Sequence, residues 1–257
     1  MVNTIIITQA RIESSRLPRK VLMKVKNKET LLSIHLKRLK KSRLAQKIIL
    51  ATTFENGVDE LIKIGRENGV EIFQGDTENV LERFYKASCS YRPKLIVRVT
   101  SDCPLIDNRI IDNLIEIAIE EKLDYVSNTF EETFPDGQDV EVFTFETLKK
   151  TYKEAKLKSD KEHVTPFMRR NSNFFSSNIF SSKNIKSSIN YSNVRMTVDE
   201  IEDFKAIHFL IKKFGYNLDW EVYADFITSN PLLFKNQYIL RNEGYEKSLL
   251  NDKVAKA

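Results

Sequence analysis

The chain has 257 residues and a formal net charge of +5, with 41% hydrophobic and 30% charged residues. This length suits one large α/β domain, and the proportions are typical of a globular chain rather than a disordered one. No apolar run reaches the ~20 residues of a membrane-spanning helix, the basic residues are dispersed, and the two cysteines predict no disulfide framework. We therefore expect a cytoplasmic protein that neither inserts into a membrane nor binds nucleic acid.

In chain order, the first half alternates strand and helix patterns. Short runs of β-branched and apolar residues predict strands over 4–8, 47–52, 70–73 and 95–100. Apolar residues at helical spacing predict helices over 31–41, 58–68, 77–88 and 109–121. Strands and helices that alternate at this spacing indicate a parallel sheet with right-handed crossovers.

The second half loses this alternation. Its patterns predict strands over 124–128, 139–143 and 194–198, and helices over 145–155, 162–171, 200–213 and 220–229. Residues 172–190 are rich in serine and asparagine, which predicts a loop suited to contact a neighbouring subunit. Pro231 ends the last helical pattern before a C-terminal tail.

A polar and cationic stretch directly follows the first predicted strand. It contains Gln9, Arg11, Ser14, Ser15, Arg16 and Lys20, and Pro18 prevents an ordinary helix. Open α/β sheets bind ligands at the carboxyl ends of their strands, and Arg and Lys bind phosphate oxygens, so the stretch predicts a polyphosphate site. No glycine lies between Met1 and Asn56, which excludes a Walker A loop and a dinucleotide fingerprint. A solvated basic loop is the alternative interpretation.

The segment ARIESSRLPRKVL resembles the N-terminal signature of the sugar cytidylyltransferases, which make CMP-sialate, CMP-KDO and related CMP-nonulosonates. The matching positions are Arg11, Ser14, Arg16, Pro18, Lys20 and Leu22. Glu13 stands where the family usually has glycine, and Val21 stands where it often has asparagine. The resemblance spans nearly the whole chain, and residues 236–249 are similar to the branch that contains spore-coat polysaccharide biosynthesis protein F and the CMP-pseudaminate synthetases.

This resemblance implies one nucleotide-diphospho-sugar transferase-like (Rossmann-like) domain over 1–257, with a mainly parallel central sheet. Residues 125–190 would then form an acceptor-binding and dimerisation subregion of a homodimer. The implied nucleotide-binding residues are Gln9, Ala10, Arg11, Ser14, Ser15, Arg16, Lys20, Thr100 and Ser101. Among them Arg11, Arg16 and Lys20 would act in catalysis, by stabilising the triphosphate and the departing pyrophosphate.

Two aspartates follow predicted strands at the same edge of the sheet. Asp102 comes after 95–100, and Asp199 comes after 194–198. A nucleoside triphosphate arrives with Mg²⁺, which binds one or two carboxylates together with phosphate oxygens and water. Each aspartate alone is also a common helix N-cap. RVTSDCPLID and RMTVDEIED are similar to two metal-binding segments of the CMP-KDO synthetases, which implies Mg²⁺ on Asp102 and Asp199 and leaves Asp203 either a second-shell or a helix-turn role.

Four further residues are candidates for binding an acceptor sugar. Asp139 and Glu141 follow a glycine turn, and Glu162 and His163 lie near a predicted helix start. In the branch that the chain resembles, such segments line the acceptor pocket. Acidic side chains and His can bind sugar hydroxyls, and a basic residue can bind a sugar carboxylate. A helix-start histidine bonded to a nearby carboxylate is the alternative for His163, while Arg83 either packs its helix or approaches the nucleotide.

We therefore expect a Mg²⁺-dependent sugar cytidylyltransferase that transfers CMP from CTP to a nonulosonate-type acidic sugar and releases pyrophosphate. The preference for cytidine depends on the resemblance alone. A glycosyltransferase of the same fold is one alternative, although no Asp-x-Asp motif follows a predicted strand. A non-catalytic nucleotide-binding subunit of a polysaccharide pathway is another, and the departures at Glu13 and Val21 favour it.

Overall fold

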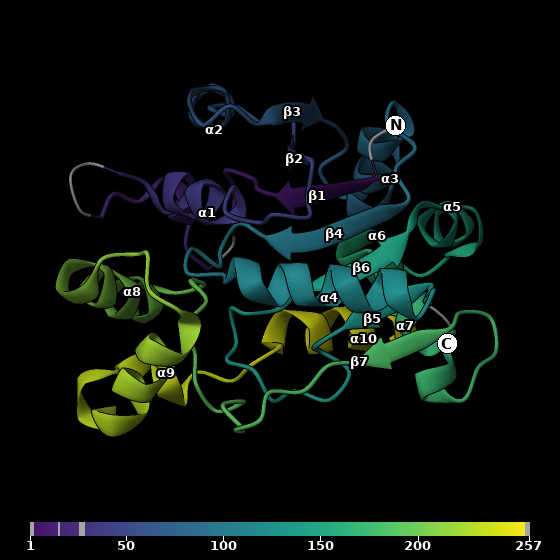
Figure 1. The fold of residues 1–257 in the computed structure, drawn as a ribbon. Helices are drawn as coiled ribbons and strands as arrows, with labels where there is room; N and C mark the ends of the chain where they lie inside the picture. The colour runs from purple at the N-terminus through teal and green to yellow at the C-terminus, as the bar shows by residue number, and fades with distance from the viewer. Residues whose placement is uncertain (1–2, 15, 26–28, 255–257) are drawn as a thin grey trace.

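The central feature of the fold is a seven-stranded sheet in the order β3-β2-β1-β4-β6-β5-β7 (Figure 1). The structure is a computed structural model that describes residues 3–14, 16–25 and 29–254. Strand β6 runs antiparallel to both of its neighbours, and the other pairs are parallel. The strands are β1 (Thr4–Gln9), β2 (Lys47–Thr52), β3 (Glu71–Gln74), β4 (Leu95–Thr100), β5 (Tyr125–Ser127), β6 (Glu141–Thr144) and β7 (Ser182–Asn184). The predicted α/β class with a mainly parallel sheet is confirmed.

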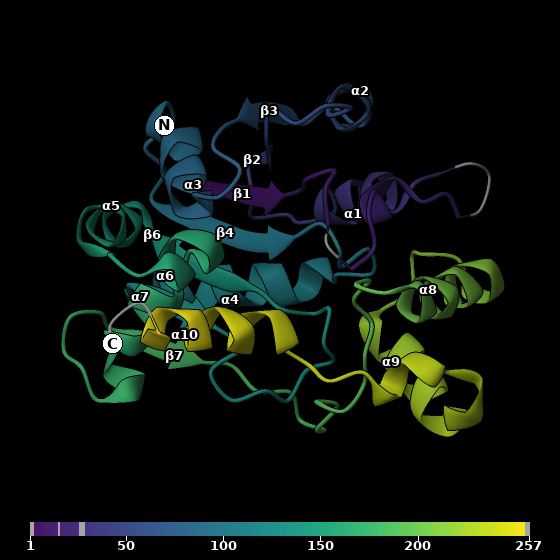
Figure 2. The same ribbon diagram turned by 180° about the vertical axis from the view of Figure 1, so that it is seen from behind.

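Helices cover both faces of this sheet, which Figures 1 and 2 show from opposite sides. The α-helices are α1 (Leu31–Leu39), α2 (Asp59–Glu67), α3 (Val80–Cys89), α4 (Asn108–Glu120), α5 (Phe145–Glu154), α6 (Lys158–His163), α7 (Pro166–Arg170), α8 (Ile201–Phe214), α9 (Trp220–Ser229) and α10 (Glu243–Val254). Short 3-10 turns are η1 (Lys20–Leu22), η3 (Asn173–Phe175), η4 (Pro231–Leu233) and η5 (Lys235–Tyr238). Leu114 of α4 and Leu210 of α8 belong to one apolar cluster, and Phe84 of α3 and Leu148 of α5 belong to the other.

Strand β1 is buried on both faces, as its unbroken apolar run predicts. Ile6 packs into the first cluster, whereas Ile5 and Ile7 pack into the second. Strand β4 lies beside β1 in parallel, and their last residues, Gln9 and Thr100, are register partners. The loops that follow these two strands therefore start side by side at one edge of the sheet.

Three predicted elements are wrong in detail. Residues 194–198 form no strand; Arg195 makes only an isolated β-bridge, with Asp136. The predicted helix over 162–171 is divided into α6 and α7, because Val164 has a φ of 71° and Pro166 has no N–H to continue the α6 ladder. The predicted loop over 172–190 contains β7, which pairs in parallel with β5.

The C-terminal tail is the largest addition to the predicted picture. It forms η5 and then α10, which lies next to α6 on the face of the sheet opposite α4 (Figure 2). Among the described residues, no helix combines the length and apolar character needed to cross a membrane. The homodimer contact that we expect through residues 125–190 stays a prediction, as does a cytoplasmic location.

Candidate active site

The loop after β1 is fixed by a carboxylate that follows β2. Glu55 accepts hydrogen bonds from the backbone N–H groups of Ile12 at 3.0 Å and Glu13 at 3.1 Å. The Ile12 side chain is buried, and its carbonyl oxygen accepts the Arg19 N–H at 2.9 Å. These backbone bonds hold the loop without the glycine that the resembling family has at position 13. The sequence analysis missed Glu55, although an acid at the carboxyl end of a neighbouring parallel strand was a usable signal.

Lys20 lies between the two aspartates that the sequence predicts as metal ligands. Its ammonium donates to Asp102 Oδ2 at 2.8 Å and to Asp199 Oδ1 at 2.9 Å. Burial alone would lower the pKa of Lys20, but the two carboxylates raise it above its usual value. Burial alone would raise the pKa of Asp102, but the Lys20 charge and hydrogen bond hold it well below its usual range. Both partners are therefore charged at neutral pH.

A backbone hydrogen bond explains why two aspartates so far apart in sequence meet. The Val198 N–H donates to the carbonyl oxygen of Asp102 at 2.8 Å, which places Asp199 beside the end of β4. Asp102 itself follows β4, the neighbour of β1. The sequence predicts that the cationic loop and the two aspartates lie at one edge of the sheet. In the structure Lys20, Asp102 and Asp199 are in contact there.

Two arginines form ion pairs with Asp199. Arg16 Nη2 lies 2.7 Å from Asp199 Oδ1, and Arg195 Nη2 lies 3.0 Å from Asp199 Oδ2. Arg195 is buried and also contacts Asp136 at 2.6 Å and both oxygens of Asp203. The sequence analysis did not single out Arg195, because it lies in the middle of a segment that it interpreted as a buried strand.

Asp203 organises the loop that carries Asp199. Its side chain is fully buried, and its Oδ2 accepts the backbone N–H groups of Asp199 and Glu200, both at 2.9 Å. Its Oδ1 accepts from Arg195 Nε at 2.8 Å and from Asn236 Nδ2 at 3.1 Å. Of the two roles that the sequence left open for Asp203, these contacts are those of a carboxylate behind the site at the start of α8.

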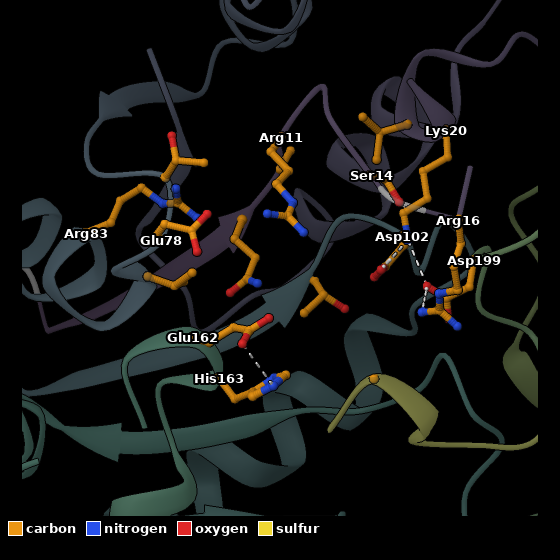
Figure 3. A pocket seen from close by; sticks show the side chains of 17 residues that line it. Arg11, Ser14, Arg16, Lys20, Glu78, Arg83, Asp102, Glu162, His163 and Asp199 are labelled. Atoms are coloured by element: carbon orange, nitrogen blue, oxygen red, sulfur yellow. Dashed lines mark hydrogen bonds and ion pairs between the residues drawn. The ribbon is translucent and has the colours of Figure 1, made fainter. Parts of the chain in front are cut away.

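These groups surround a cavity of about 290 Å³, shown in Figure 3. The lining includes the following residues from the predicted set: Gln9, Ala10, Arg11, Ser14, Arg16, Lys20, Thr100, Asp102, Glu162, His163 and Asp199. Ser101 does not line it; its side chain is 1% exposed and its hydroxyl lies 2.9 Å from that of Thr8 inside the core. A strand residue alternates faces, so the neighbour of a pocket residue commonly points inward. Ser15 lies outside the described residues.

Arg83 and Gln9 both line the cavity. Arg83 and Glu78 lie at the end opposite Lys20 and Asp199, with Arg11 between the two ends (Figure 3). Arg83 is 2% exposed, and its Nη1 donates to the Asp76 carbonyl oxygen at 2.8 Å. This hydrogen bond holds the Arg83 guanidinium at that end of the cavity.

A second cavity, of about 390 Å³, adjoins the first and shares Thr100 and His163 with it. Asp139 and Glu141, predicted to bind the acceptor, line this second cavity, as do Arg98 and Arg169. Glu141 is buried, accepts from Arg98 Nη1 at 2.5 Å and also accepts the Tyr125 hydroxyl. Asp139 accepts from Arg241 Nη2 at 2.7 Å. The four predicted acceptor residues are therefore divided between two connected cavities, with His163 at their boundary.

The donor set at Lys20 fits a hard divalent cation. Asp102 and Asp199 present carboxylate oxygens to one point, which a positive charge, the Lys20 ammonium, already occupies. Over the described ranges, no group of three or more His, Cys, Asp or Glu side chains forms a complete metal site. Mg²⁺ does not need one, since it usually keeps waters and takes further oxygens from a substrate phosphate.

The fold and this cavity define an α/β protein with a ligand site at the carboxyl edge of a mainly parallel sheet, lined by both basic and acidic side chains. The chain belongs to the cytidylyltransferase family, whose model matches residues 5–237. It is 30% identical to the spore coat polysaccharide biosynthesis protein SpsF of Bacillus subtilis, over 85% of this chain and 90% of that one.

Two further comparisons agree with this membership. An uncharacterized protein of Methanocaldococcus jannaschii is 36% identical, over 94% of this chain and 97% of its own length. The solved structure of a cytidylyltransferase from Leptospira borgpetersenii superposes with a TM-score of 0.85 at 30% identity, covering 94% of this chain and 100% of that chain. Both likenesses extend over nearly the whole chain, so the family covers the sheet, the cationic loop and both aspartates.

Proposed function

We propose that this protein transfers CMP from CTP to a nonulosonate-type acidic sugar and releases pyrophosphate, for the synthesis of a surface polysaccharide or glycan. The observation that carries this proposal is the meeting of Lys20, Asp102 and Asp199 in one cavity whose wall also carries Arg11 and Arg16. Membership of the cytidylyltransferase family supports CTP as the donor, and the relationship to SpsF supports a polysaccharide pathway.

In this mechanism the acceptor hydroxyl attacks the α-phosphorus of CTP and loses its proton to water. A new P–O bond forms, and the bond to pyrophosphate breaks. The protein contributes mainly position and charge. Arg11, Arg16 and Lys20 would bind the triphosphate and stabilise the charge that collects on pyrophosphate as it leaves. Because Lys20 and Arg16 both contact Asp199 in the free protein, they are already held at the triphosphate end of the cavity.

Mg²⁺ would be held by Asp102 and Asp199. When bound, it would supply Lewis-acid stabilisation of the phosphate charge and lower the pKa of a coordinated hydroxyl. Arg195 orients Asp199 through Oδ2 at 3.0 Å, and Asp203 fixes the backbone of the same loop. Asp199 therefore keeps its position independently of the cation.

The end of the cavity opposite Lys20 would hold the cytosine base. Cytosine presents acceptors at O2 and N3 and a donor at N4. Arg83 carries guanidinium donors, and the Gln9 amide carries both a donor and an acceptor. We propose that these two side chains contact the base, with Arg11 between them and the triphosphate.

The second cavity would hold the acceptor sugar. Arg98 and Arg169 supply positive charge for a sugar carboxylate, and Asp139, Glu141 and Thr165 supply oxygen acceptors for sugar hydroxyls. Its junction with the first cavity at Thr100 and His163 would bring an acceptor hydroxyl toward the α-phosphate.

The test is pyrophosphate release from CTP, UTP, ATP and GTP with sialic, pseudaminic, legionaminic and KDO acceptors in the presence of Mg²⁺. We expect release with CTP and at least one acidic sugar, and we expect Lys20→Ala and Asp102→Ala to abolish it while the folded circular dichroism spectrum is kept. Lys183→Ala is the matched control, since Lys183 pairs with Glu121 on the surface away from the cavity. Near-normal turnover in either site variant, or release of a nucleoside diphosphate instead, would refute the proposal.

A further inference from the structure

The C-terminal helix α10 lies beyond the segment that defines the family, yet it forms part of both cavities. The family match ends at residue 237, and α10 begins at Glu243. Gly244 lines the first cavity, whereas Asn242, Tyr245 and Glu246 line the second. A segment beyond the family model that forms the wall of a binding cavity is suited to adjust what that cavity accepts.

Helix α10 is attached to α6 by polar contacts at the boundary of the two cavities. Ser248 Oγ donates to Glu162 Oε2 at 2.9 Å and lies 3.0 Å from His163 Nε2. Further along the helix, Asp252 accepts the backbone N–H of Ser159 at 3.2 Å. Ser248 and Asp252 are both buried, so these contacts are shielded from solvent.

The Ser248 contacts determine the tautomer of the neutral imidazole. A serine hydroxyl has one hydrogen, and Ser248 gives it to Glu162. Its oxygen then accepts from His163 Nε2–H, so in the neutral ring Nδ1 is the nitrogen without a hydrogen. Burial lowers the pKa of His163 below its usual value, and this favours the same neutral form.

Tyr245 places an aromatic ring against the same histidine. The two ring centroids are 5.2 Å apart in an edge-on arrangement, and Tyr245 lines the second cavity beside His163. Asn242 Nδ2 donates to Glu132 Oε1 at 2.7 Å, and both of these residues also line the second cavity. The first turn of α10 and the residue before it therefore form one continuous wall.

We propose that α10 selects the acceptor sugar: Tyr245 contacts the sugar directly, and Ser248 positions His163 and Glu162 where the sugar meets the nucleotide. This inference rests on the proposed function and assigns its acceptor specificity to a segment outside the family match. The acceptor class is an acidic sugar with an apolar ring or side-chain face, since the cavity combines the Tyr245 ring with Arg98 and Arg169.

The experiment compares Tyr245→Ala, Tyr245→Phe, Ser248→Ala and Ser248→Thr with Leu250→Ala, a control on the same helix whose side chain is 58% exposed. We expect Tyr245→Ala to raise KM for the acceptor at least tenfold and to leave KM for CTP within twofold. Tyr245→Phe keeps the ring and should stay within threefold of the unmodified protein. An equal change in both KM values, or none in the acceptor KM, would overturn the direct role of Tyr245.

Ser248 is a positioning residue, so its readout is the pH dependence of kcat/KM for the acceptor. Without the Ser248 hydroxyl, His163 Nε2–H loses its acceptor, and the charged imidazolium is disfavoured. We therefore expect the acidic limb of the profile to shift downward by at least half a pH unit in Ser248→Ala. Ser248→Thr retains the hydroxyl and should restore the profile. A uniform loss of kcat in both variants with an unchanged pH profile would mean that Ser248 only stabilises the packing of α10 against α6.

Failure of the inference and failure of the proposed function are separable. If the unmodified protein releases pyrophosphate but the α10 variants behave like Leu250→Ala, the function stands and the inference is wrong. If no acceptor is turned over, the proposed function fails, and calorimetry of the same four sugars with the protein bound to a non-hydrolysable CTP analogue decides the inference. Sugar binding that Tyr245→Ala abolishes supports it, whereas no binding, or binding unchanged in that variant, overturns it.

Discussion

At the scale of single residues, the site depends on carboxylates that act through other groups. Asp203 is not among the cavity-lining residues, but it accepts the N–H groups of Asp199 and Glu200 and hydrogen bonds from Arg195 Nε and Nη2. Glu55 likewise accepts two backbone N–H groups of the loop after β1. Both keep cationic and anionic side chains in place without direct contact with the space that a ligand would occupy.

We expect Asp203→Asn to destabilise the fold and to weaken the site together. The substitution leaves the Arg195 charge with less compensation in a buried setting, where breaking an ion pair costs on the order of 3–5 kcal/mol. Urea denaturation would measure the change in the free energy of unfolding. Glu202→Gln, next to it in α8, is the control, because its exposed pair with Lys205 is worth less than about 1 kcal/mol. Equal stabilities for the two variants would contradict the organising role of Asp203.

At the scale of elements, the sequence predicts what its own periodicity encodes. The strands and helices of the first half are found because buried β-branched runs and amphipathic repeats are local signals, and Gln9 and Asp102 meet because parallel strands share an edge. Residues 194–198 have the apolar pattern of a strand but do not form one. Their side chains are buried against loops, and their backbone groups form hydrogen bonds with the backbones of Asp136 and Asp102 instead of with a neighbouring strand. Helix α10 could not be placed on the cavities, because its contacts to α6 join residues far apart in sequence.

Helix α1 is connected to the sheet by a buried histidine, and this connection should respond to pH. His35 Nδ1 lies 2.9 Å from the Cys103 carbonyl oxygen and Nε2 lies 2.9 Å from the Thr8 hydroxyl. Burial lowers the pKa of His35 to about 4. Below the unfolded pKa of about 6.5 the unfolded chain binds the proton more readily, so stability is full above pH 6.5 and falls as the pH drops toward 4.

From these values we expect the stability that His35 contributes to drop by about 2 kcal/mol between pH 7.5 and pH 5. The measurement is urea denaturation of the unmodified protein, His35→Gln and His208→Gln at both pH values. His35→Gln should lose that part of the pH dependence even if it is less stable at every pH. His208→Gln should keep it, and an identical pH dependence in all three proteins would mean that His35 is not the responsible group.

At the scale of the whole molecule, three distant segments form the triphosphate end of the cavity. The loop after β1 supplies Lys20 and Arg16, the end of β4 supplies Asp102, and the loop before α8 supplies Asp199. A ligand that binds all three connects parts of the chain that otherwise meet through side-chain ion pairs and a few backbone hydrogen bonds. Binding of CTP should therefore stabilise the fold as one unit, by mass action on the native state.

At a CTP concentration one hundred times its Kd, with Mg²⁺ present, the free energy of unfolding should rise by about 2.7 kcal/mol. For a chain of this size this is a rise in Tm of about 5–10 °C. Differential scanning calorimetry with CTP, with UTP and with pyrophosphate would measure it. The shift should be larger with CTP than with pyrophosphate, because pyrophosphate has no base for the Arg83 end of the cavity. It should be larger with CTP than with UTP, because cytosine has a donor at N4 where uracil has an acceptor at O4. Lys20→Ala should lose most of the shift and Lys183→Ala none, and a full CTP shift in Lys20→Ala would show that the triphosphate binds elsewhere on the molecule.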